Sequence, residues 1–272
     1  MKPADARVVL TGATGGIGES VARALLRGGA SVMPVSRSAQ RLATLCDTLC
    51  QGEPQWRQRL APQVLDINDA AGVTSLSAAA SAWRANVLIN NAGVPSFGSF
   101  ETLDATQMAE VIHTNLLVPM RLTQALLPAL RQQASAQVIQ VGSALGRLGL
   151  PGYAAYCASK FGLRGFTEAL RRELAGTPVK VQYLGPRSTR TRFNDARVEA
   201  YNLATKTQMD SAQVVAEALL ALLVSEAAEK FIGFPEKLAV RLNGLSPALL
   251  DGAFGEHRRQ ISSPQELART LS

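Results

Sequence analysis

The sequence has few of the residues that form disulfide frameworks and metal sites. Its 272 residues include three cysteines and two histidines, and an odd number of cysteines in a chain of this length gives no disulfide framework. Cys46 and Cys50 share one face of a predicted helix, but no histidine or further cysteine lies near them in the sequence. We therefore expect no metal site, and this cysteine usage is typical of a reducing cytoplasm.

Long hydrophobic runs are also absent. The longest, around residues 214–224, is too short to cross a bilayer and predicts a buried helix. The opening residues, MKPADARVVL, lack an apolar stretch followed by a cleavage site, so we expect no signal peptide. Hydrophobic residues make up 47% of the chain and charged residues 18%, which is typical of a well-buried globular protein. These features predict a cytoplasmic protein without stable membrane insertion.

Acidic residues are outnumbered by basic ones, and the net charge is +7. The surplus is concentrated in residues 171–206, which contain eight basic and three acidic residues. Aromatic residues interleaved with the basic ones, zinc-ligand spacing and a recognition-helix pattern are all missing, so we expect no nucleic-acid partner. The basic segment is then either a solvated face or a surface that attracts a phosphate-bearing cofactor or substrate.

A glycine-rich segment follows the first predicted strand. Residues 7–10 (RVVL) form a short β-branched run, TGATGGIG begins at Thr11, and helical character starts at Glu19. In such a strand–turn–helix unit the glycines let the backbone approach a pyrophosphate, and the helix N-terminus offers free N–H groups and a positive dipole end. The T-G-x-x-x-G-x-G spacing differs from G-x-G-x-x-G but predicts a nucleotide site. The alternative is a flexible turn without a ligand.

The second predicted strand, residues 30–35, ends at Ser36 and Arg37. In nucleotide-binding folds this position, about 20 residues past the glycine loop, contacts the adenosine ribose, and an acidic residue there binds the 2′-hydroxyl of NAD. The sequence instead offers a hydroxyl and a guanidinium, which suit the 2′-phosphate of NADP. Arg41, one helical turn on, is placed to assist. The alternative is a solvated arginine at the start of a helix.

Strands and helices alternate through the rest of the chain. Later strands are predicted to end at Leu65 and to cover residues 86–89, 137–142, 179–184 and 230–234; predicted helices include 39–50, 103–131 with an interruption at Pro119, 156–174 and 211–224. This alternation predicts an α/β fold, a Rossmann-like doubly wound parallel sheet of seven strands in the order 3-2-1-4-5-6-7 with helices on both faces. We expect one domain over residues 1–272, of which 235–272 form a C-terminal helical extension.

Polar residues follow several of the predicted strands. Asp66 follows the third, where a carboxylate either meets an adenine amino group or caps the next helix. Asn91 and Gly93 follow the fourth, and Ser143 follows the fifth. Because the crossovers of a doubly wound sheet bring the C-terminal ends of its strands to one edge, we expect these residues in a single cleft.

Tyr156 and Lys160 stand four residues apart in a predicted helix, so they share one face, one turn apart. A cation beside a phenol favours the phenolate, and we expect the pKa of Tyr156 to fall from about 10 towards working pH. Such a tyrosine exchanges a proton with a substrate oxygen. Tyr153 has Cys157 four residues on and no lysine partner.

In this arrangement the sequence resembles the short-chain dehydrogenase/reductase family over roughly residues 7–234. TGATGGIG resembles the family's T-G-x-x-x-G-x-G cofactor loop, and the four residues from Asn90 match its N-N-A-G segment. The family's catalytic tetrad falls on Asn115, Ser143, Tyr156 and Lys160. The resemblance, with the ribose argument above, implies that NADP(H) contacts Thr11, Gly12, Thr14, Gly16, Ile17, Gly18, Ser36, Arg37, Asp66, Asn91, Ala92, Gly93, Tyr156, Lys160 and Thr189. After the sixth strand the chain departs from the family pattern, so Thr191 is an alternative to Thr189 at the nicotinamide carboxamide.

The resemblance implies an NADPH-dependent oxidoreductase that interconverts a carbonyl and an alcohol, and we expect a hydrophobic ketone or aldehyde as its small-molecule substrate. Ser143 would orient the carbonyl oxygen, Tyr156 protonate it, Lys160 bind the nicotinamide ribose, and Asn115 hold a water that resupplies protons. One alternative is a 3-oxoacyl-thioester reductase whose basic loop, residues 187–197, meets an acidic carrier protein. A more distant one is a non-catalytic NADP-sensing regulator. Relatives commonly form homodimers or homotetramers through the helices that here contain Asn115 and Tyr156.

Beyond residue 234, apolar residues recur at helical spacing. They are Leu238, Leu242, Leu245, Leu249, Leu250 and Phe254. This pattern predicts a pair of short helices packed on the substrate side or on a partner subunit, with a lid over a long apolar substrate as one form of the idea. Docking on a membrane surface is disfavoured because basic and acidic residues nearly cancel in this segment.

Overall fold

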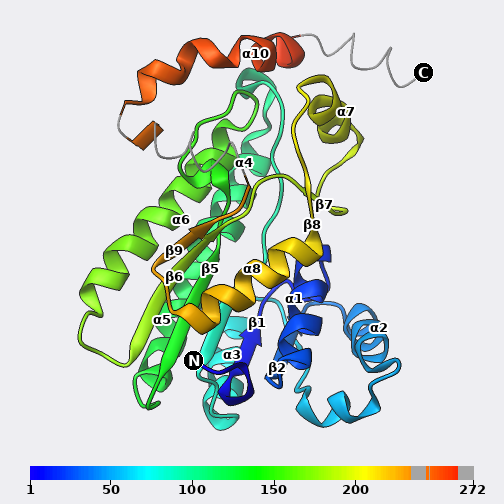
Figure 1. Cartoon of the computed structure of the whole chain (residues 1–272), viewed down its shortest axis with the longest axis vertical. Coiled ribbons are helices and arrows are strands. Elements are labelled where there is room, and N and C mark those ends of the chain that lie inside the picture. Colours follow the sequence, from blue (N-terminus) through cyan, green and yellow to red (C-terminus); the bar gives the residue numbers. More distant parts are fainter. Residues whose placement is uncertain (234–242, 245, 263–272) are drawn as a thin grey trace.

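The computed structural model describes residues 1–233, 243–244 and 246–262. Its main sheet has seven parallel strands in the order β3-β2-β1-β4-β5-β6-β9 (Figure 1). The strands are β1 Arg7–Leu10, β2 Ser31–Ser36, β3 Gln63–Val64, β4 Val87–Asn90, β5 Ala136–Val141, β6 Val179–Gly185 and β9 Glu229–Phe231. The predicted order is confirmed, with β9 as the predicted seventh strand. Residue 234, the predicted end of that strand, lies outside the described residues.

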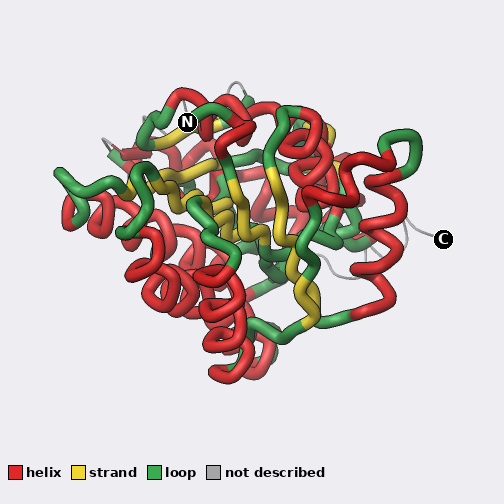
Figure 2. Tube along the Cα trace, turned by 90° about the horizontal axis from the view of Figure 1, so that it is seen from below, coloured by secondary structure: helices red, strands yellow, loops and turns green. Residues whose placement is uncertain are grey.

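Helices cover both faces of the sheet, and Figure 2 shows the strands between the helical layers. The helices are α1 Gly16–Arg27, α2 Ala39–Cys50, α3 Ala70–Ala82, α4 Ala105–Ile112, α5 Val118–Leu130, α6 Ala154–Glu173, α7 Ala196–Ala204, α8 Ala212–Ser225 and α10 Gly255–Ser262. In the described part of the chain, none of them is both long and apolar enough to cross a membrane.

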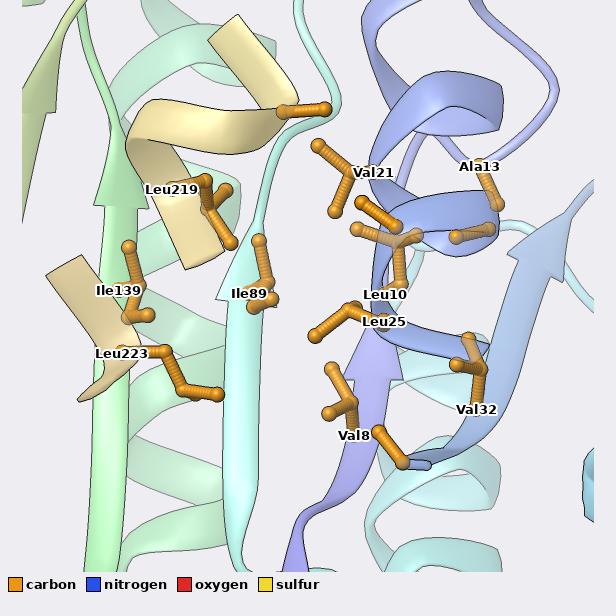
Figure 3. Packing of buried hydrophobic residues seen from close by; sticks show 14 of the residues in the cluster. Val8, Leu10, Ala13, Val21, Leu25, Val32, Ile89, Ile139, Leu219 and Leu223 are labelled. Carbon is orange, nitrogen blue, oxygen red and sulfur yellow. The ribbon is translucent and has the colours of Figure 1, made fainter. Parts of the chain in front are cut away.

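The core divides into two layers, one on each face of the sheet. Alternate residues of a strand point to opposite faces, so Val8 and Leu10 belong to one buried cluster and Val9 to the other. The first cluster is completed by α1, α2 and α8, with residues such as Val21 and Leu219 packed over the strands (Figure 3). The second is completed by α3, α5 and α6. Every strand runs in the same direction, and the loops that follow the strands therefore meet at one edge.

The helical segment predicted for residues 103–131 is divided elsewhere than expected. A π-helical turn, His113–Leu117, separates α4 from α5, whereas Pro119 lies in the first turn of α5. The predicted interruption at Pro119 is therefore wrong by several residues. Pro119 does not interrupt the helix, because α5 continues directly from the π-helical turn with helical backbone angles at Leu117 and Val118. A π-helical turn has no marker of this kind in the sequence, and such turns are frequent at functional sites.

Three elements between β6 and α8 have no counterpart among the predicted ones. β7 Thr189–Arg190 pairs with β8 Asp210–Ser211 in a small parallel ribbon. The helix α7 begins after Asp195, whose carboxylate accepts a hydrogen bond from Val198 N at 2.9 Å. An aspartate that caps a helix N-terminus is a recognisable signal, and here it marks a helix that begins at the end of the predicted basic loop, residues 187–197.

The C-terminal residues lie at the end of the molecule towards which the strands point. Residues 247–254 form a 3₁₀ helix that continues into α10, and α10 lies beside α7 (Figure 1). Leu250 and Phe254 pack against the buried residues Ala144 and Leu148, which follow β5. Of the other predicted helix positions in this segment, residues 238, 242 and 245 lie outside the described residues.

Candidate active site

Ser143 comes directly after β5 and begins a short 3₁₀ turn, Ala144–Gly146. Its Oγ accepts a hydrogen bond from Leu145 N at 3.1 Å and donates one to the Pro186 carbonyl oxygen at 3.4 Å. The residue is 9% exposed. The serine hydroxyl is thus held at the C-terminal edge of the sheet, between the loops that follow β5 and β6.

Tyr156 and Lys160 lie one turn apart on α6, as predicted. The Lys160 ammonium is over the Tyr156 ring, with Nζ 5.6 Å from the ring centre, and it donates to the Val141 carbonyl oxygen at 3.3 Å. Lys160 is 4% exposed, and burial lowers its pKa from 10.5 to about 8.

The pKa of Tyr156 does not follow the sequence prediction. Burial of the ring raises this pKa above the ordinary value of 10, and a hydrogen bond with the Ser143 side chain opposes the rise. The loss of hydration disfavours the phenolate, and its effect on the pKa is larger than the opposing effect of the neighbouring groups. Burial therefore outweighs the lowering effect of Ser143 on the pKa of Tyr156.

Asn115 is fully buried in the π-helical turn. Its amide exchanges two hydrogen bonds with the backbone of Val94: Oδ1 accepts from the N–H at 2.8 Å and Nδ2 donates to the carbonyl at 3.0 Å. Nδ2 also lies 3.3 Å from Ser159 Oγ on α6. A Cβ on Gly93 would lie 3.0 Å from Asn115 Oδ1 and 3.8 Å from Lys160 Nζ. The loop after β4, the π-helical turn and α6 therefore converge around Gly93.

The glycine loop after β1 is braced by the loop after β4. Thr11 Oγ1 accepts hydrogen bonds from the N–H groups of Asn91 and Ala92, at 3.0 and 3.1 Å. In return, Asn91 Nδ2 donates to the carbonyl oxygens of Thr11 and Gly12, at 3.2 and 3.1 Å. These side chains hold the two motifs against each other. Thr14 and the glycines that follow it take no part in these hydrogen bonds.

The shape of this loop fits the pyrophosphate of a dinucleotide. Gly12 has a φ of +63°, and a Cβ there would lie 2.7 Å from Ala92 Cα. A Cβ on Gly18 would overlap the Gly12 carbonyl oxygen. No side chain caps the N-terminus of α1, which begins at Gly16. The residues thus form a cradle that only glycine permits, opposite the positive end of a helix, with Ile17 half-buried in its first turn.

Ser36, Arg37 and Arg41 lie where β2 ends and α2 begins. Ser36 Oγ accepts a hydrogen bond from Ser38 N at 3.2 Å, and Arg41 Nη2 donates to the Thr14 carbonyl oxygen at 3.1 Å. This bond brings Arg41 to the glycine loop. Arg37 is exposed and has no hydrogen bond or ion pair with any part of the chain that the structure describes.

Asp66 forms a turn with Asn68, accepting hydrogen bonds from its N–H and its Nδ2, both at 2.9 Å. The cap of α3 is instead Asp69, which accepts from Gly72 N at 2.6 Å. Asn68 is also tied to the π-helical turn, because its carbonyl oxygen lies 3.1 Å from His113 Nε2 and its Oδ1 accepts from Thr114 Oγ1. The loop after β3 is therefore joined to the turn that holds Asn115.

Thr189 and Thr191 occupy different surroundings. Thr189 is 7% exposed, and its Oγ1 donates to the Arg187 carbonyl oxygen at 3.0 Å. Thr191 lies against the start of α1, where a Cβ on Gly16 would be 2.7 Å from its Cγ2. The side chain of Arg187, part of the predicted basic loop, is paired with Asp210 at 2.8 Å.

Sequence reasoning missed a group of aromatic residues around Tyr156. Tyr153 and Phe193 both approach its ring edge-on, with centroids 6.2 Å away. Phe97 and Tyr201 pack against Tyr153, with centroids 4.9 and 6.0 Å away. These rings come from four separate segments, so no local pattern in the sequence announces the group.

The helix α10 packs against this aromatic group. Tyr201 Oη lies 2.5 Å from His257 Nδ1, and the Phe254 ring is 5.7 Å from the His257 ring. Ile261 reaches Gly152, where a Cβ would lie 2.9 Å from its Cδ1. Burial lowers the pKa of His257 below its ordinary value of 6.5, which favours the neutral ring beside the tyrosine hydroxyl.

Comparison with known proteins identifies the family. A family model described as short chain dehydrogenase matches residues 6–202. The chain is 31% identical over 254 residues to the ketoacyl reductase HetN of Nostoc sp., covering 90% of this chain and 86% of that protein. It is 30% identical over 225 residues to an acetoacetyl-CoA reductase of Acinetobacter sp., covering 79% and 87%.

A solved structure agrees with these matches. A variant of the actinorhodin polyketide ketoreductase with NADPH superposes with a TM-score of 0.76 at 27% identity, covering 85% of this chain and 97% of the other. A match over more than half of the chain, together with relatives at 30% identity or above, establishes the family. The chain belongs to the short-chain dehydrogenase/reductase family of oxidoreductases, which use NAD(P)(H).

Proposed function

We propose that the protein is an NADPH-dependent reductase that converts the carbonyl group of a hydrophobic ketone or aldehyde into an alcohol. The observation that carries the proposal is the meeting of Ser143, Tyr156 and Lys160 at the sheet edge onto which the glycine loop opens. A hydroxyl that orients, a phenol that donates a proton and a buried ammonium stand together beside a cradle of glycines that fits a dinucleotide.

Each residue then has a defined task. Bound NADPH supplies the hydride that reduces the carbonyl carbon. Tyr156 donates its proton to the carbonyl oxygen, which Ser143 Oγ orients by a second hydrogen bond. A phenol whose pKa is raised by burial stays protonated at neutral pH and is ready to donate. Lys160, close to Gly93, would bind the nicotinamide ribose, and Asn115 would hold a water that returns protons.

The preference for NADPH over NADH rests on the end of β2. Ser36 and Arg37 stand there in place of an acidic residue, and Arg37 is exposed with its guanidinium unengaged within the described residues. Arg41, held at the glycine loop, adds a second positive charge. A 2′-phosphate would receive charge-assisted hydrogen bonds from such groups. The NADPH named with the actinorhodin ketoreductase is consistent with this preference.

The expectation of an apolar substrate rests on the aromatic group. The Tyr156 ring is flanked by Tyr153 and Phe193. Phe97 and Tyr201 pack in turn against Tyr153. Rings of this kind favour apolar and planar partners and disfavour charged ones. The substrate carbonyl would reach Tyr156 with its hydrophobic part against these rings.

A 3-oxoacyl-thioester reductase is the second candidate, favoured by the names of two relatives, a ketoacyl reductase and an acetoacetyl-CoA reductase. A surface groove beside α7 is lined by three basic residues and one acidic one, together with the exposed Leu203: Arg190, Arg192, Lys206 and Glu199. Such a surface suits an acidic carrier protein or a phosphorylated carrier. Turnover of a carrier-bound substrate would then fall steeply with salt, while turnover of a small ketone would not. Equal salt dependence for both would remove this candidate.

The deciding experiment is Tyr156→Phe. We expect NADPH binding to survive and turnover of a reducible ketone to fall by about 10²–10⁴-fold, the usual contribution of positioned acid catalysis. Unchanged turnover would rule the mechanism out. A non-catalytic NADP-sensing regulator would bind NADPH equally well with either residue and reduce nothing, so wild-type activity towards any carbonyl compound eliminates that interpretation.

We also infer a homodimer or homotetramer. Phe161 on α6 and Leu117 at the end of the π-helical turn are 42% and 43% exposed, and they lie on the helices that relatives use for pairing. Exposed apolar side chains of this size favour burial against a second copy.

A further inference from the structure

Tyr183 occupies a space that two glycines leave open. The residue lies in β6, beside β5, and is 1% exposed. A Cβ on Gly142 would overlap the Tyr183 ring, and one on Gly146 would overlap its hydroxyl oxygen. Gly142 and Gly146 flank the segment that begins with Ser143. A side chain at either glycine is therefore incompatible with the tyrosine, and the turn from β5 towards α6 closes around the phenol.

The Tyr183 hydroxyl makes two hydrogen bonds with one residue, Ser143. It accepts from the Ser143 N–H at 3.0 Å and donates to the Ser143 carbonyl oxygen at 2.9 Å. The backbone of Ser143 is extended, with φ −162° and ψ 161°. One buried hydroxyl thus holds both backbone polar groups of the residue whose side chain is to orient the substrate oxygen.

Neighbouring residues are held differently. The N–H groups of Gly142 and Ala144 donate to the carbonyl oxygens of Leu184 and Pro186, at 2.8 and 2.7 Å, which continues the pairing of β5 with β6. The Ser143 N–H lies between them and is satisfied by the phenol. A buried backbone N–H without a partner costs about 1–3 kcal/mol, so the chain needs a donor–acceptor group at this place, and Tyr183 supplies it.

From this geometry we infer that Tyr183 is a positioning residue for Ser143. It reaches across from β6, fixes the serine backbone at both ends, and thereby sets where Oγ lies relative to the Tyr156 hydroxyl. This inference rests on the proposed carbonyl reduction and adds a second tyrosine to its machinery, one that touches neither substrate nor cofactor.

The inference has a consequence for the titration of Tyr156. A hydrogen bond with the Ser143 side chain lowers the pKa of Tyr156 against the effect of burial. Other groups around this ring are the Lys160 ammonium, the Cys157 thiol and the Tyr153 phenol, and none of them touches Tyr183 by a hydrogen bond within the described residues. A displaced Ser143 would weaken the effect of its hydroxyl and leave the other groups in place, so the pKa of Tyr156 would rise.

The test is Tyr183→Phe, which keeps the ring and removes the hydroxyl. We expect kcat for ketone reduction to fall about tenfold or more, as for the loss of one buried hydrogen-bonded group, with KM for NADPH unchanged. Lys160, with a pKa of about 8, titrates before Tyr156 and sets the loss of activity at alkaline pH, so this loss should keep its position in the variant. A lower kcat with both of these signs supports the positioning role.

Thr167→Val is the matched control, because Thr167 is fully buried on the same helix as Tyr156 and bonds only to the Leu163 carbonyl oxygen among the described residues. It should lower stability and leave the pH profile of kcat in place. If Tyr183→Phe behaves like this control, losing stability but not kcat, the inference is wrong. A wild-type enzyme active in the assay and a dead Tyr156→Phe variant separate that failure from failure of the proposed function.

Gly142→Ala gives an independent route, and it carries the test alone if Tyr183→Phe does not fold. Its methyl group would push the Tyr183 ring away from Ser143 and should reproduce the loss of kcat. Because both changes act through the position of Ser143, the double variant Gly142→Ala/Tyr183→Phe should lose little more than the worse of the two single variants. Losses that multiply would show two separate effects and overturn the inference.

Discussion

The Lys160 ammonium and the Tyr156 ring face each other inside the protein, with Nζ 5.6 Å from the ring centre and a hydrogen bond from Nζ to the Val141 carbonyl oxygen. In the described part of the chain, no carboxylate is paired with this ammonium. Burial alone accounts for the fall of its pKa from 10.5 to about 8. The arrangement therefore keeps a positive charge in the core at a cost in stability, and in the proposed function this charge would bind the nicotinamide ribose.

The first prediction concerns stability and pH. Between pH 8 and pH 10 the unfolded chain holds a proton on Lys160 that the folded chain releases, so this residue makes the folded state more stable as pH rises, and costs most below pH 8. We expect Lys160→Met to raise the free energy of unfolding at pH 7 by up to about 3 kcal/mol, from 1.36 kcal/mol per unit of pKa shift. Urea denaturation of the cofactor-free protein at pH 7 and pH 9.5 measures it.

The comparison with wild type isolates this residue from the buried tyrosines and cysteines, whose raised pKa values act in the opposite direction at high pH. The gain from Lys160→Met should shrink between pH 7 and pH 9.5. A gain that is equal at both values would mean that the ammonium is not the source of the cost. The variant should lose nearly all turnover at either pH.

A second prediction tests the cofactor preference. Arg37→Ala should weaken NADPH binding by about 10–100-fold, since a charge-assisted hydrogen bond contributes about 1.5–3 kcal/mol, and should leave NADH binding unchanged. Fluorescence titration with both nucleotides measures the ratio. Arg27→Ala removes an exposed arginine from the far end of α1 and serves as the control for a general loss of positive charge. Equal weakening of NADPH and NADH would contradict the 2′-phosphate assignment.

A third prediction decides between the two threonines that follow β6. Thr191 lies against Gly16 in the glycine loop, whereas the Thr189 hydroxyl is already bonded to the Arg187 carbonyl oxygen. We expect Thr191→Ala to raise KM for NADPH several-fold, because a contact next to the cofactor cradle is lost, and Thr189→Ala to lower stability with little change in KM. Steady-state kinetics and thermal unfolding of the two variants provide the measurement. The reverse pattern would return the nicotinamide contact to Thr189.

A fourth prediction concerns Asn115 and the loop after β4. Asn115→Ala removes both hydrogen bonds to the Val94 backbone, and leaving such buried groups unpaired should lower the free energy of unfolding by about 1–3 kcal/mol. Ser159→Ala, which removes a single bond to the same amide, should have a smaller effect. Urea denaturation compares them. A variant of Asn115 as stable as wild type would mean that the loop is held by other contacts.

Much of the fold follows from local patterns. The order of the seven strands was predictable because each strand is a short apolar run, each glycine turn is visible in the sequence, and right-handed crossovers leave few arrangements. Asp195, which caps α7, is a local signal that sequence reasoning passed over. The π-helical turn at Asn115 has no such signal. What stabilises its extra residue is the set of contacts that Asn115 makes with Val94 and Ser159, and these residues are far from it in the sequence.

The sequence by itself determined the family, the strand order and the candidate residues Ser143, Tyr156 and Lys160, because those depend on motif spacing and hydrophobic periodicity along the chain. Tertiary structure alone decided what surrounds them. It placed Tyr183 between Gly142 and Gly146, brought the aromatic rings of four segments to Tyr156, and made burial the dominant influence on the pKa of that tyrosine. The physical reason is that packing and desolvation depend on residues far apart in sequence, whose approach no local pattern records.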